Sequence, residues 1–97
     1  MLNRNKVIEV LKQFRKKHAS QYGISEIGVF GSIARDDRRE QSDVDIVVKL
    51  NRQDLFCLIG IKQDLEEILN TQVDIVSYRE MMNAFLKKRI DKEAIYV

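Results

Sequence analysis

The chain has 97 residues, of which 44% are hydrophobic and 33% are charged. This length has room for one small domain, so we expect residues 1–97 to form a single unit. The 17 basic and 15 acidic residues leave a net charge of only +2. That near balance argues against direct binding of nucleic acid through bulk charge.

The N-terminal residues lack the apolar segment of a signal peptide, and no apolar run is long enough to cross a membrane. The single cysteine, Cys57, lies in an apolar run and has no partner for an internal disulfide. A reducing compartment suits such a chain. We therefore expect a cytoplasmic protein that does not contact a membrane.

The first third of the chain predicts a helix followed by a strand. Residues 3–21 carry apolar side chains at helical spacing with Lys and Arg between them, and Gly23 suits the end of that helix. Residues 24–30 are rich in Ile, Val and Phe, which is typical of a strand. Gly31 and Ser32 then break the strand.

Residues 33–38 are predicted to form a short helix, and residues 43–50 a second strand. The strand period of two divides this second strand between two faces. One face receives Asp43, Asp45 and Val47, and the other receives Val44, Ile46 and Val48.

Asn51 is a predicted N-cap for a helix that continues to about residue 69. Its predicted buried stripe contains Leu55, Leu58, Ile59, Leu65, Ile68 and Leu69. Residues 72–76 are predicted as a third strand. Ser77 and Glu80 match a capping box, which places the start of the last helix there. The predicted core face of that helix contains Met82, Phe85, Leu86 and Ile90.

Strands separated by helices predict an α+β fold with two layers, in which helices pack on a small mixed sheet. The pattern does not decide whether the strands run parallel.

Gly31 and Ser32 lie where a strand meets a predicted helix. Glycine allows a tight turn and a close backbone approach, and a helix N-terminus favours a phosphate group. Arg35 lies one helical turn after Ser32 and would reach the same anion. The alternative is an ordinary turn with an N-capping serine.

Asp43 and Asp45 point to the same side of their strand, so their charges repel unless a cation lies between them. Mg²⁺ accepts one or two protein carboxylates together with substrate phosphates. The alternative is a solvated acidic face. Asp74, between apolar residues in the third strand, would join the same face as a general base or a metal ligand. Its alternative is an edge residue that faces water.

A phosphate-binding turn, a carboxylate pair and a third carboxylate together are the parts that transfer of a phosphoryl-type group requires. Other polar residues are weaker candidates. His18 is expected on a helix surface and Cys57 in the core. The run from Lys87 to Arg89 is expected to complement a helix dipole, with phosphate or partner binding as the alternative.

Two segments carry a family resemblance: residues 28–35, which contain Gly31-Ser32, and residues 42–46, which contain Asp43-Val44-Asp45. They resemble the signature of nucleotidyltransferases related to DNA polymerase beta, and especially the minimal nucleotidyltransferase (MNT) branch. The resemblance implies the nucleotidyltransferase fold over nearly the whole chain.

The resemblance also implies residue roles. Gly31 and Ser32, with Arg35, would hold the phosphates of ATP. Asp43 and Asp45 would bind Mg²⁺ and belong to the catalytic set, and Asp74 would complete that set as a metal ligand or as the base for the acceptor hydroxyl.

MNT proteins are commonly antitoxins of HEPN-type RNase toxins, and the resemblance implies transfer of AMP from ATP to a tyrosine of such a partner, encoded nearby. Two alternatives remain. One is an antitoxin that neutralises its toxin by binding alone. The other is a nucleotidyltransferase of small molecules, which the absence of an acceptor-binding domain in this sequence disfavours.

Overall fold

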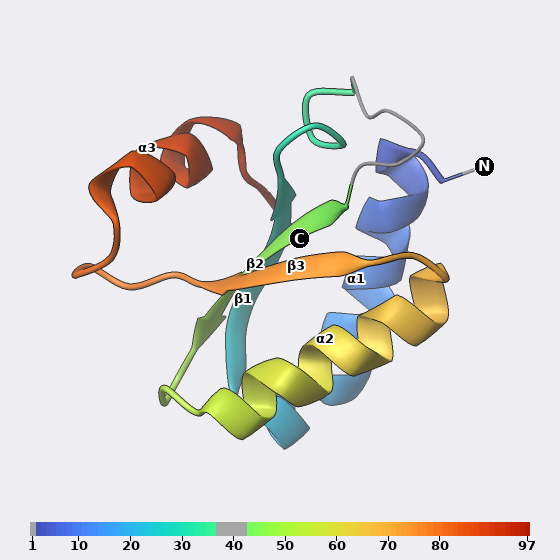
Figure 1. The fold of residues 1–97 in the computed structure, drawn as a ribbon. Coiled ribbons are helices and arrows are strands. Elements are labelled where there is room, and N and C mark those ends of the chain that lie inside the picture. The colour runs from blue at the N-terminus through green and yellow to red at the C-terminus, as the bar shows by residue number, and fades with distance from the viewer. Residues whose placement is uncertain (1, 37–42) are drawn as a thin grey trace.

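The computed structural model describes residues 2–36 and 43–97. These residues form a four-stranded sheet and three helices (Figure 1). The elements in chain order are α1 (Arg4–Tyr22), β1 (Ile24–Phe30), β2 (Val44–Leu50), α2 (Leu55–Leu69), β3 (Val73–Ser77), α3 (Ala84–Glu93) and β4 (Ile95–Tyr96). The predicted α+β class and mixed sheet are confirmed.

The strand order in the sheet is β3-β2-β1-β4. The β2 and β3 strands run parallel because α2 returns the chain between them, whereas β1 is antiparallel to both β2 and β4. The two-residue strand β4 was not predicted, and it pairs Tyr96 with Gly28. Within residues 2–36 and 43–97, no helix is both long and apolar enough to span a membrane.

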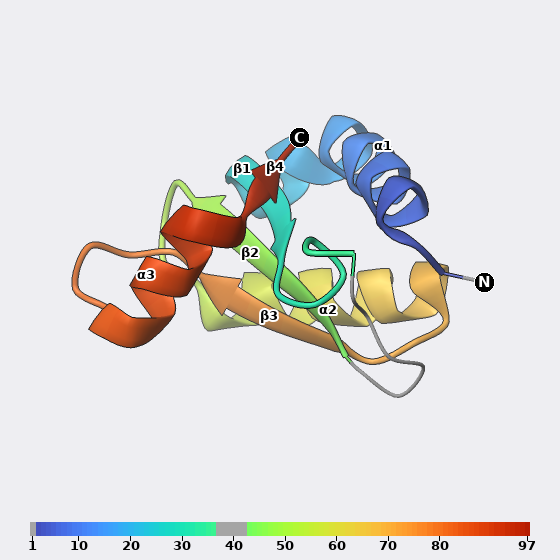
Figure 2. The same ribbon diagram turned by 90° about the horizontal axis from the view of Figure 1, so that it is seen from above.

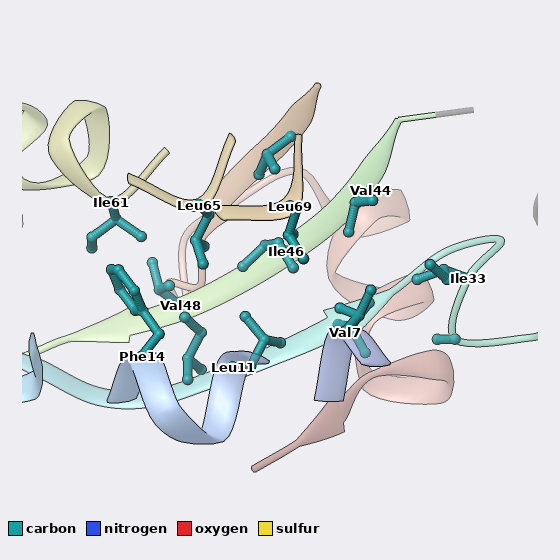
Figure 3. Packing of buried hydrophobic residues seen from close by; sticks show 14 of the residues in the cluster. Val7, Leu11, Phe14, Ile33, Val44, Ile46, Val48, Ile61, Leu65 and Leu69 are labelled. Atoms are coloured by element: carbon teal, nitrogen blue, oxygen red, sulfur yellow. The ribbon is translucent and has the colours of Figure 1, made fainter. Parts of the chain in front are cut away.

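The helices α1 and α2 cover one face of the sheet and form the larger core. Figure 3 shows side chains from both helices meeting those of β2, where the predicted alternation is confirmed. The core residues contributed by these three elements are Val7, Leu11, Phe14, Val44, Ile46, Val48, Ile61, Leu65 and Leu69.

Helix α3 stands apart from α1 and α2 (Figures 1 and 2) and packs on the other face of the sheet. The fully buried residues here are Phe30, Val47 and Ile90, with Val76, Met82 and Leu86 partly buried beside them. This second cluster is small, so most of the apolar burial in the described residues lies on the α1 and α2 face.

The boundaries of α1 follow from its caps. Asn3 accepts a hydrogen bond from the Lys6 amide, and Gly23 ends the helix at φ 67° with its own amide bonded to the Ala19 carbonyl. The predicted stop at Gly23 is thus confirmed.

The N-cap of α2 is Asp54, and the prediction of Asn51 was wrong. The Asp54 side chain accepts from the Phe56 and Cys57 amides, while the Asn51 amide is bonded to the Gly23 carbonyl. Because this bond ties Asn51 to the end of the sheet, the helix begins three residues later.

The predicted buried stripe of α2 was partly wrong. Leu55, Ile59 and Ile68 are 69%, 42% and 53% exposed. The buried positions are Ile61, Leu65 and Leu69, which repeat every four residues. The helix therefore contacts the sheet along a narrow line, and apolar residues beside that line stay at the surface.

The predicted capping box at Ser77 was also wrong. Ser77 ends β3, and its hydroxyl donates to the Gln53 side chain at 2.8 Å. Helix α3 begins at Ala84 after the N-cap Asn83, whose side chain accepts from the Leu86 amide. Phe85, predicted in the core, is 79% exposed, whereas Ile90 is buried as predicted.

The short helix predicted over residues 33–38 is absent from its described part. Residues 31–36 form turns, in which the Arg35 amide donates to the Gly31 carbonyl and the Asp36 amide to the Ile33 carbonyl. Positive φ angles at Gly31 (75°) and Asp36 (63°) are incompatible with a helix. Residues 37 and 38 lie outside the described residues.

Candidate active site

Asp45 and Asp74 lie side by side on adjacent strands. They are paired positions in the parallel ladder of β2 and β3. Their neighbours in the ladder, Val47 and Val76, pack against α3, so alternation directs both carboxylates to that same side of the sheet. Asp43, immediately before β2, precedes Asp45 by two residues, and its negative charge acts on the Asp45 carboxyl. The structure therefore brings together the three carboxylates that the sequence singled out.

The closeness of the three carboxylates affects the pKa of Asp45. Asp45 is half-buried, whereas Asp43 and Asp74 are exposed. Burial is the largest cause that raises the pKa of Asp45 to about 6, and the negative charges of Asp74 and Asp43 add to it. The positive charges of Arg89 and Arg35 lower the pKa and partly offset the shift. Asp45 therefore favours a nearby cation.

Gly31 brings the backbone against the Asp45 carboxylate. A Cβ at this position would lie 3.0 Å from Cγ of Asp45 and would collide with its Oδ2. The φ of 75° independently favours glycine. Ile33 and Ala34 are buried in the core and hold the turn in place, and Arg4 donates to the Ala34 carbonyl at 3.3 Å. The turn is thus fixed beside the carboxylate.

Ser32 is half-buried and directly follows Gly31. Because the segment is a turn and not a helix, the expected helix dipole is absent, and any anion here would meet turn amides and side chains. Arg35 was expected one helical turn after Ser32, but it lies in this turn and its guanidinium points to α3. Its Nη1 lies 2.6 Å from Oε1 of Glu93 on α3.

Two residues that reasoning from the sequence did not place in the site lie beside it. Arg89 sits over the ring of Phe30, with 5.8 Å from its guanidinium carbon to the ring centroid, and Phe30 pairs directly with Asp45 across β1 and β2. Glu93 lies between Arg89 and Arg35. No spacing in the sequence connects these helix residues with the distant turn. The sequence signal for Arg89 was the run of basic residues from Lys87, for which phosphate binding was one alternative.

The donor set fits Mg²⁺ completed by a substrate. Among residues 2–36 and 43–97, no three His, Cys, Asp or Glu side chains are arranged as a metal-binding group. Mg²⁺ typically uses only one or two carboxylates and takes its remaining ligands from water and phosphates. Asp43 and Asp45 are the carboxylates that could form such a pair, and the absence of a Cβ at Gly31 lets the Asp45 carboxylate lie directly against the turn.

His18 and Cys57 lie away from these carboxylates. His18, on α1, lies tilted against the ring of Phe14 and contacts Gln21 at 2.7 Å. It lines an apolar pocket between α1 and Ile68 of α2, on the core side of the sheet. Cys57 is in the first turn of α2 and only partly buried, so its predicted core position is only partly reached.

Known proteins share this architecture. A protein adenylyltransferase, MntA, of Thermococcus cleftensis is 33% identical, and the match covers 100% of this chain and 98% of the relative. A solved structure provisionally described as a minimal nucleotidyltransferase has a TM-score of 0.77 and 29% identity, with 97% and 95% of the two chains covered. A chain in the crystal structure of a toxin–antitoxin with AMP-PNP has a TM-score of 0.70 and 25% identity, with 98% of this chain and 72% of that chain covered.

The family model described as polymerase beta, nucleotidyltransferase matches residues 5–97, which contain every strand and nearly all of α1. This match spans the Gly31 turn, the paired strands that carry Asp45 and Asp74, and α3. The chain belongs to the polymerase beta nucleotidyltransferase family.

Proposed function

We propose that this chain is a Mg²⁺-dependent protein adenylyltransferase that transfers AMP from ATP to a tyrosine of a HEPN-type toxin and acts as its antitoxin. The observation that carries the proposal is the pairing of Asp45 with Asp74 beside the Gly31 turn. The names of similar proteins support the group that is transferred and the setting, namely a protein adenylyltransferase and a toxin–antitoxin complex with AMP-PNP.

The residues divide the reaction between them. Gly31 and Ser32 hold the phosphates of ATP next to the acidic residues. Asp43 and Asp45 would hold Mg²⁺, which would neutralise charge on the phosphates when bound. Asp74 is exposed at the sheet surface and is available to a hydroxyl carried by another protein.

In the proposed step, the acceptor oxygen forms a bond to the α-phosphorus while the bond from that phosphorus to the bridging oxygen of the β-phosphate breaks. The bonding electrons leave with pyrophosphate, and Asp74 takes the proton of the acceptor hydroxyl.

One observation favours the second candidate, neutralisation by binding alone. Large apolar side chains are exposed at the start of α2 and near α3, which is typical of protein contact surfaces. They are Leu55, Phe56, Met81 and Phe85. Binding through this surface does not need the carboxylates, so the two candidates predict different behaviour of Asp variants.

The deciding experiment mixes the protein with a HEPN-type partner, Mg²⁺ and ATP labelled at the α-phosphate. Label should enter the partner, and peptide mapping should place it on a tyrosine. The Asp43→Asn/Asp45→Asn and Asp74→Asn variants should lose transfer by a factor of about a hundred or more. Glu67→Gln, a charge-matched change at an exposed position of α2, should transfer normally.

If the aspartate variants neutralise the toxin fully and the wild type transfers no label, the enzyme proposal fails. Neutralisation by binding alone then stands in its place.

A further inference from the structure

Arg35, Glu93 and Arg89 form a connected group of charged side chains next to the acidic residues, here termed the Arg–Glu–Arg group. Oε1 of Glu93 lies 2.6 Å from Nη1 of Arg35, and Oε2 lies 3.7 Å from Nε of Arg89. The two arginines come from different parts of the chain, the turn after β1 and the middle of α3. One carboxylate therefore joins the turn to the helix.

The group flanks Asp45 on two sides. Arg35 belongs to the turn whose first residue, Gly31, lies against the Asp45 carboxylate. Arg89 lies over Phe30, the direct cross-strand partner of Asp45. Side chains at directly paired positions are about 5 Å apart at Cβ. Both guanidinium groups are consequently near the place where a nucleotide bound to Asp45 would extend its phosphates.

The three members of the Arg–Glu–Arg group differ in burial and in charge. The Glu93 side chain is only 15% exposed, whereas both arginine side chains are 44% exposed. Within the described part of the chain, Oε2 of Glu93 is buried without a hydrogen bond. A buried carboxylate depends on nearby cations, so Glu93 restrains the arginines. The group as a whole keeps one positive charge.

Arg89 is held less tightly than Arg35. Its Nε is 3.7 Å from Glu93, which is an ion pair without a short hydrogen bond. A guanidinium offers five donors in a planar fork that suits phosphate oxygens. Arg89 can thus rotate toward a phosphate while Glu93 keeps it near the site.

We propose that Arg89 is a binding residue for the pyrophosphate leaving group, acting with Arg35, and that Glu93 is the positioning residue for both arginines. This inference rests on the proposed function of the same site. When the bond between the α-phosphorus and the bridging oxygen breaks, negative charge grows on the β-phosphate. Two guanidinium groups held there stabilise that charge.

The first test measures pyrophosphate binding to the full chain by calorimetry in the presence of Mg²⁺, with no acceptor present. Arg89→Ala should weaken binding about tenfold, which is the loss expected for one hydrogen bond to a charged group. Lys88→Ala removes the same charge from the neighbouring exposed position of α3 and should leave binding nearly unchanged. Arg89→Lys should fall between them, because it keeps the charge and loses the fork.

The second test concerns Glu93. If it positions the arginines, Glu93→Gln should weaken pyrophosphate binding several-fold, and the Arg89→Ala/Glu93→Gln double variant should lose less than the product of the two single losses. If Glu93 is merely a nearby negative charge, its removal should tighten pyrophosphate binding. Unchanged or tighter binding by Glu93→Gln overturns the positioning role, provided that circular dichroism shows a folded protein.

Equal pyrophosphate affinities of the Arg89→Ala and Lys88→Ala variants overturn the role of Arg89, as does a wild type that binds no pyrophosphate. Failure of the proposed function looks different. In that case the wild type binds pyrophosphate and ATP, and the Arg89 variant binds them weakly, but no AMP reaches a partner.

Discussion

The two faces of the sheet differ in what they bury. The α1 and α2 face carries the large apolar core, whose buried members among the described residues are all hydrophobic. On the α3 face of the described residues the buried hydrophobic cluster is small, with Phe30, Val47 and Ile90, and next to it lie the three carboxylates and the Arg–Glu–Arg group. Stability is therefore concentrated on one face, while the other keeps a half-buried acid within reach of a substrate.

Neighbouring residues of β2 test this division most strongly, because they point to opposite faces. Ile46→Ala empties space in the large core and should lower the free energy of unfolding by about 2–5 kcal/mol. Val47→Ala, in the small cluster, should cost about 1–2 kcal/mol, since fewer carbon atoms are removed and fewer buried side chains surround them. Urea denaturation measures both. Equal losses would contradict the asymmetry.

Alanine substitutions at two glycines distinguish the effect of backbone strain from that of crowding at the site. Gly23 and Gly31 both have positive φ, but the nearest atoms to a Cβ at Gly23 are 3.9 Å away. Gly23→Ala should cost about 1 kcal/mol for the left-handed backbone. Gly31→Ala should cost about 2–3 kcal/mol because it also displaces Asp45, and it should weaken ATP binding. Thermal melts and ATP titration would show whether both variants instead behave alike.

The raised pKa of Asp45 predicts that the ionised carboxylate, which the proposed metal site needs, lowers the free energy of unfolding. The folded-state pKa, raised to about 6 from 3.8, means that the folded protein prefers the protonated acid. The contribution of Asp45 to the free energy of unfolding is therefore most favourable below about pH 4 and is lost as the pH rises to about 6. In metal-free buffer at pH 7, Asp45→Asn should stabilise the protein by about 1 kcal/mol after allowance for partial solvent screening.

The stabilisation by Asp45→Asn should vanish below about pH 4, and Mg²⁺ with ATP should stabilise the wild type but not the variant. Glu67→Gln serves as the control for removing a negative charge. A wild type that is more stable than Asp45→Asn at pH 7 without metal would contradict the burial of this charge.

The smallest effect is expected at the apolar surface. Phe85→Ser and Phe56→Ser should each change the free energy of unfolding by no more than about 0.5 kcal/mol, because both rings are largely exposed. Chemical denaturation checks this, and a loss above about 1.5 kcal/mol at Phe85 would restore its predicted place in the core. Weaker binding to a HEPN-type partner with an intact fold would assign this surface to the partner.

The sequence was most informative where local pattern and tertiary contacts agree. The bounds of β1 match the predicted residues 24–30, and the alternation of β2 correctly separated Asp45 from Ile46. The convergence of Asp45 with Asp74 was inferred from alternation plus family resemblance, and the ladder register now gives it a geometric basis. The chemical roles of these residues remain predictions.

Errors arose where long-range contacts override local signals. Ser77 has the pattern of a cap, yet the strand ladder with Val48 and the bond to Gln53 hold it in β3. The strand β4 is too short to leave a periodic signal and exists through its pairing with β1. Glu93 joins Arg35 across 58 positions, a relation that no spacing within one segment encodes.

The pairing of β4 with β1 has a consequence for the order of folding. This pairing returns the chain after α3 to the sheet. Glu93 is the last residue of α3, so it reaches Arg35 only when this return is complete. Long-range closures of this kind form slowly compared with local helices. We expect an intermediate that already holds the α1 and α2 core but lacks the completed Arg–Glu–Arg group. Pulsed hydrogen exchange during refolding would detect it as late protection of the Val97 amide, which bonds to Ile27.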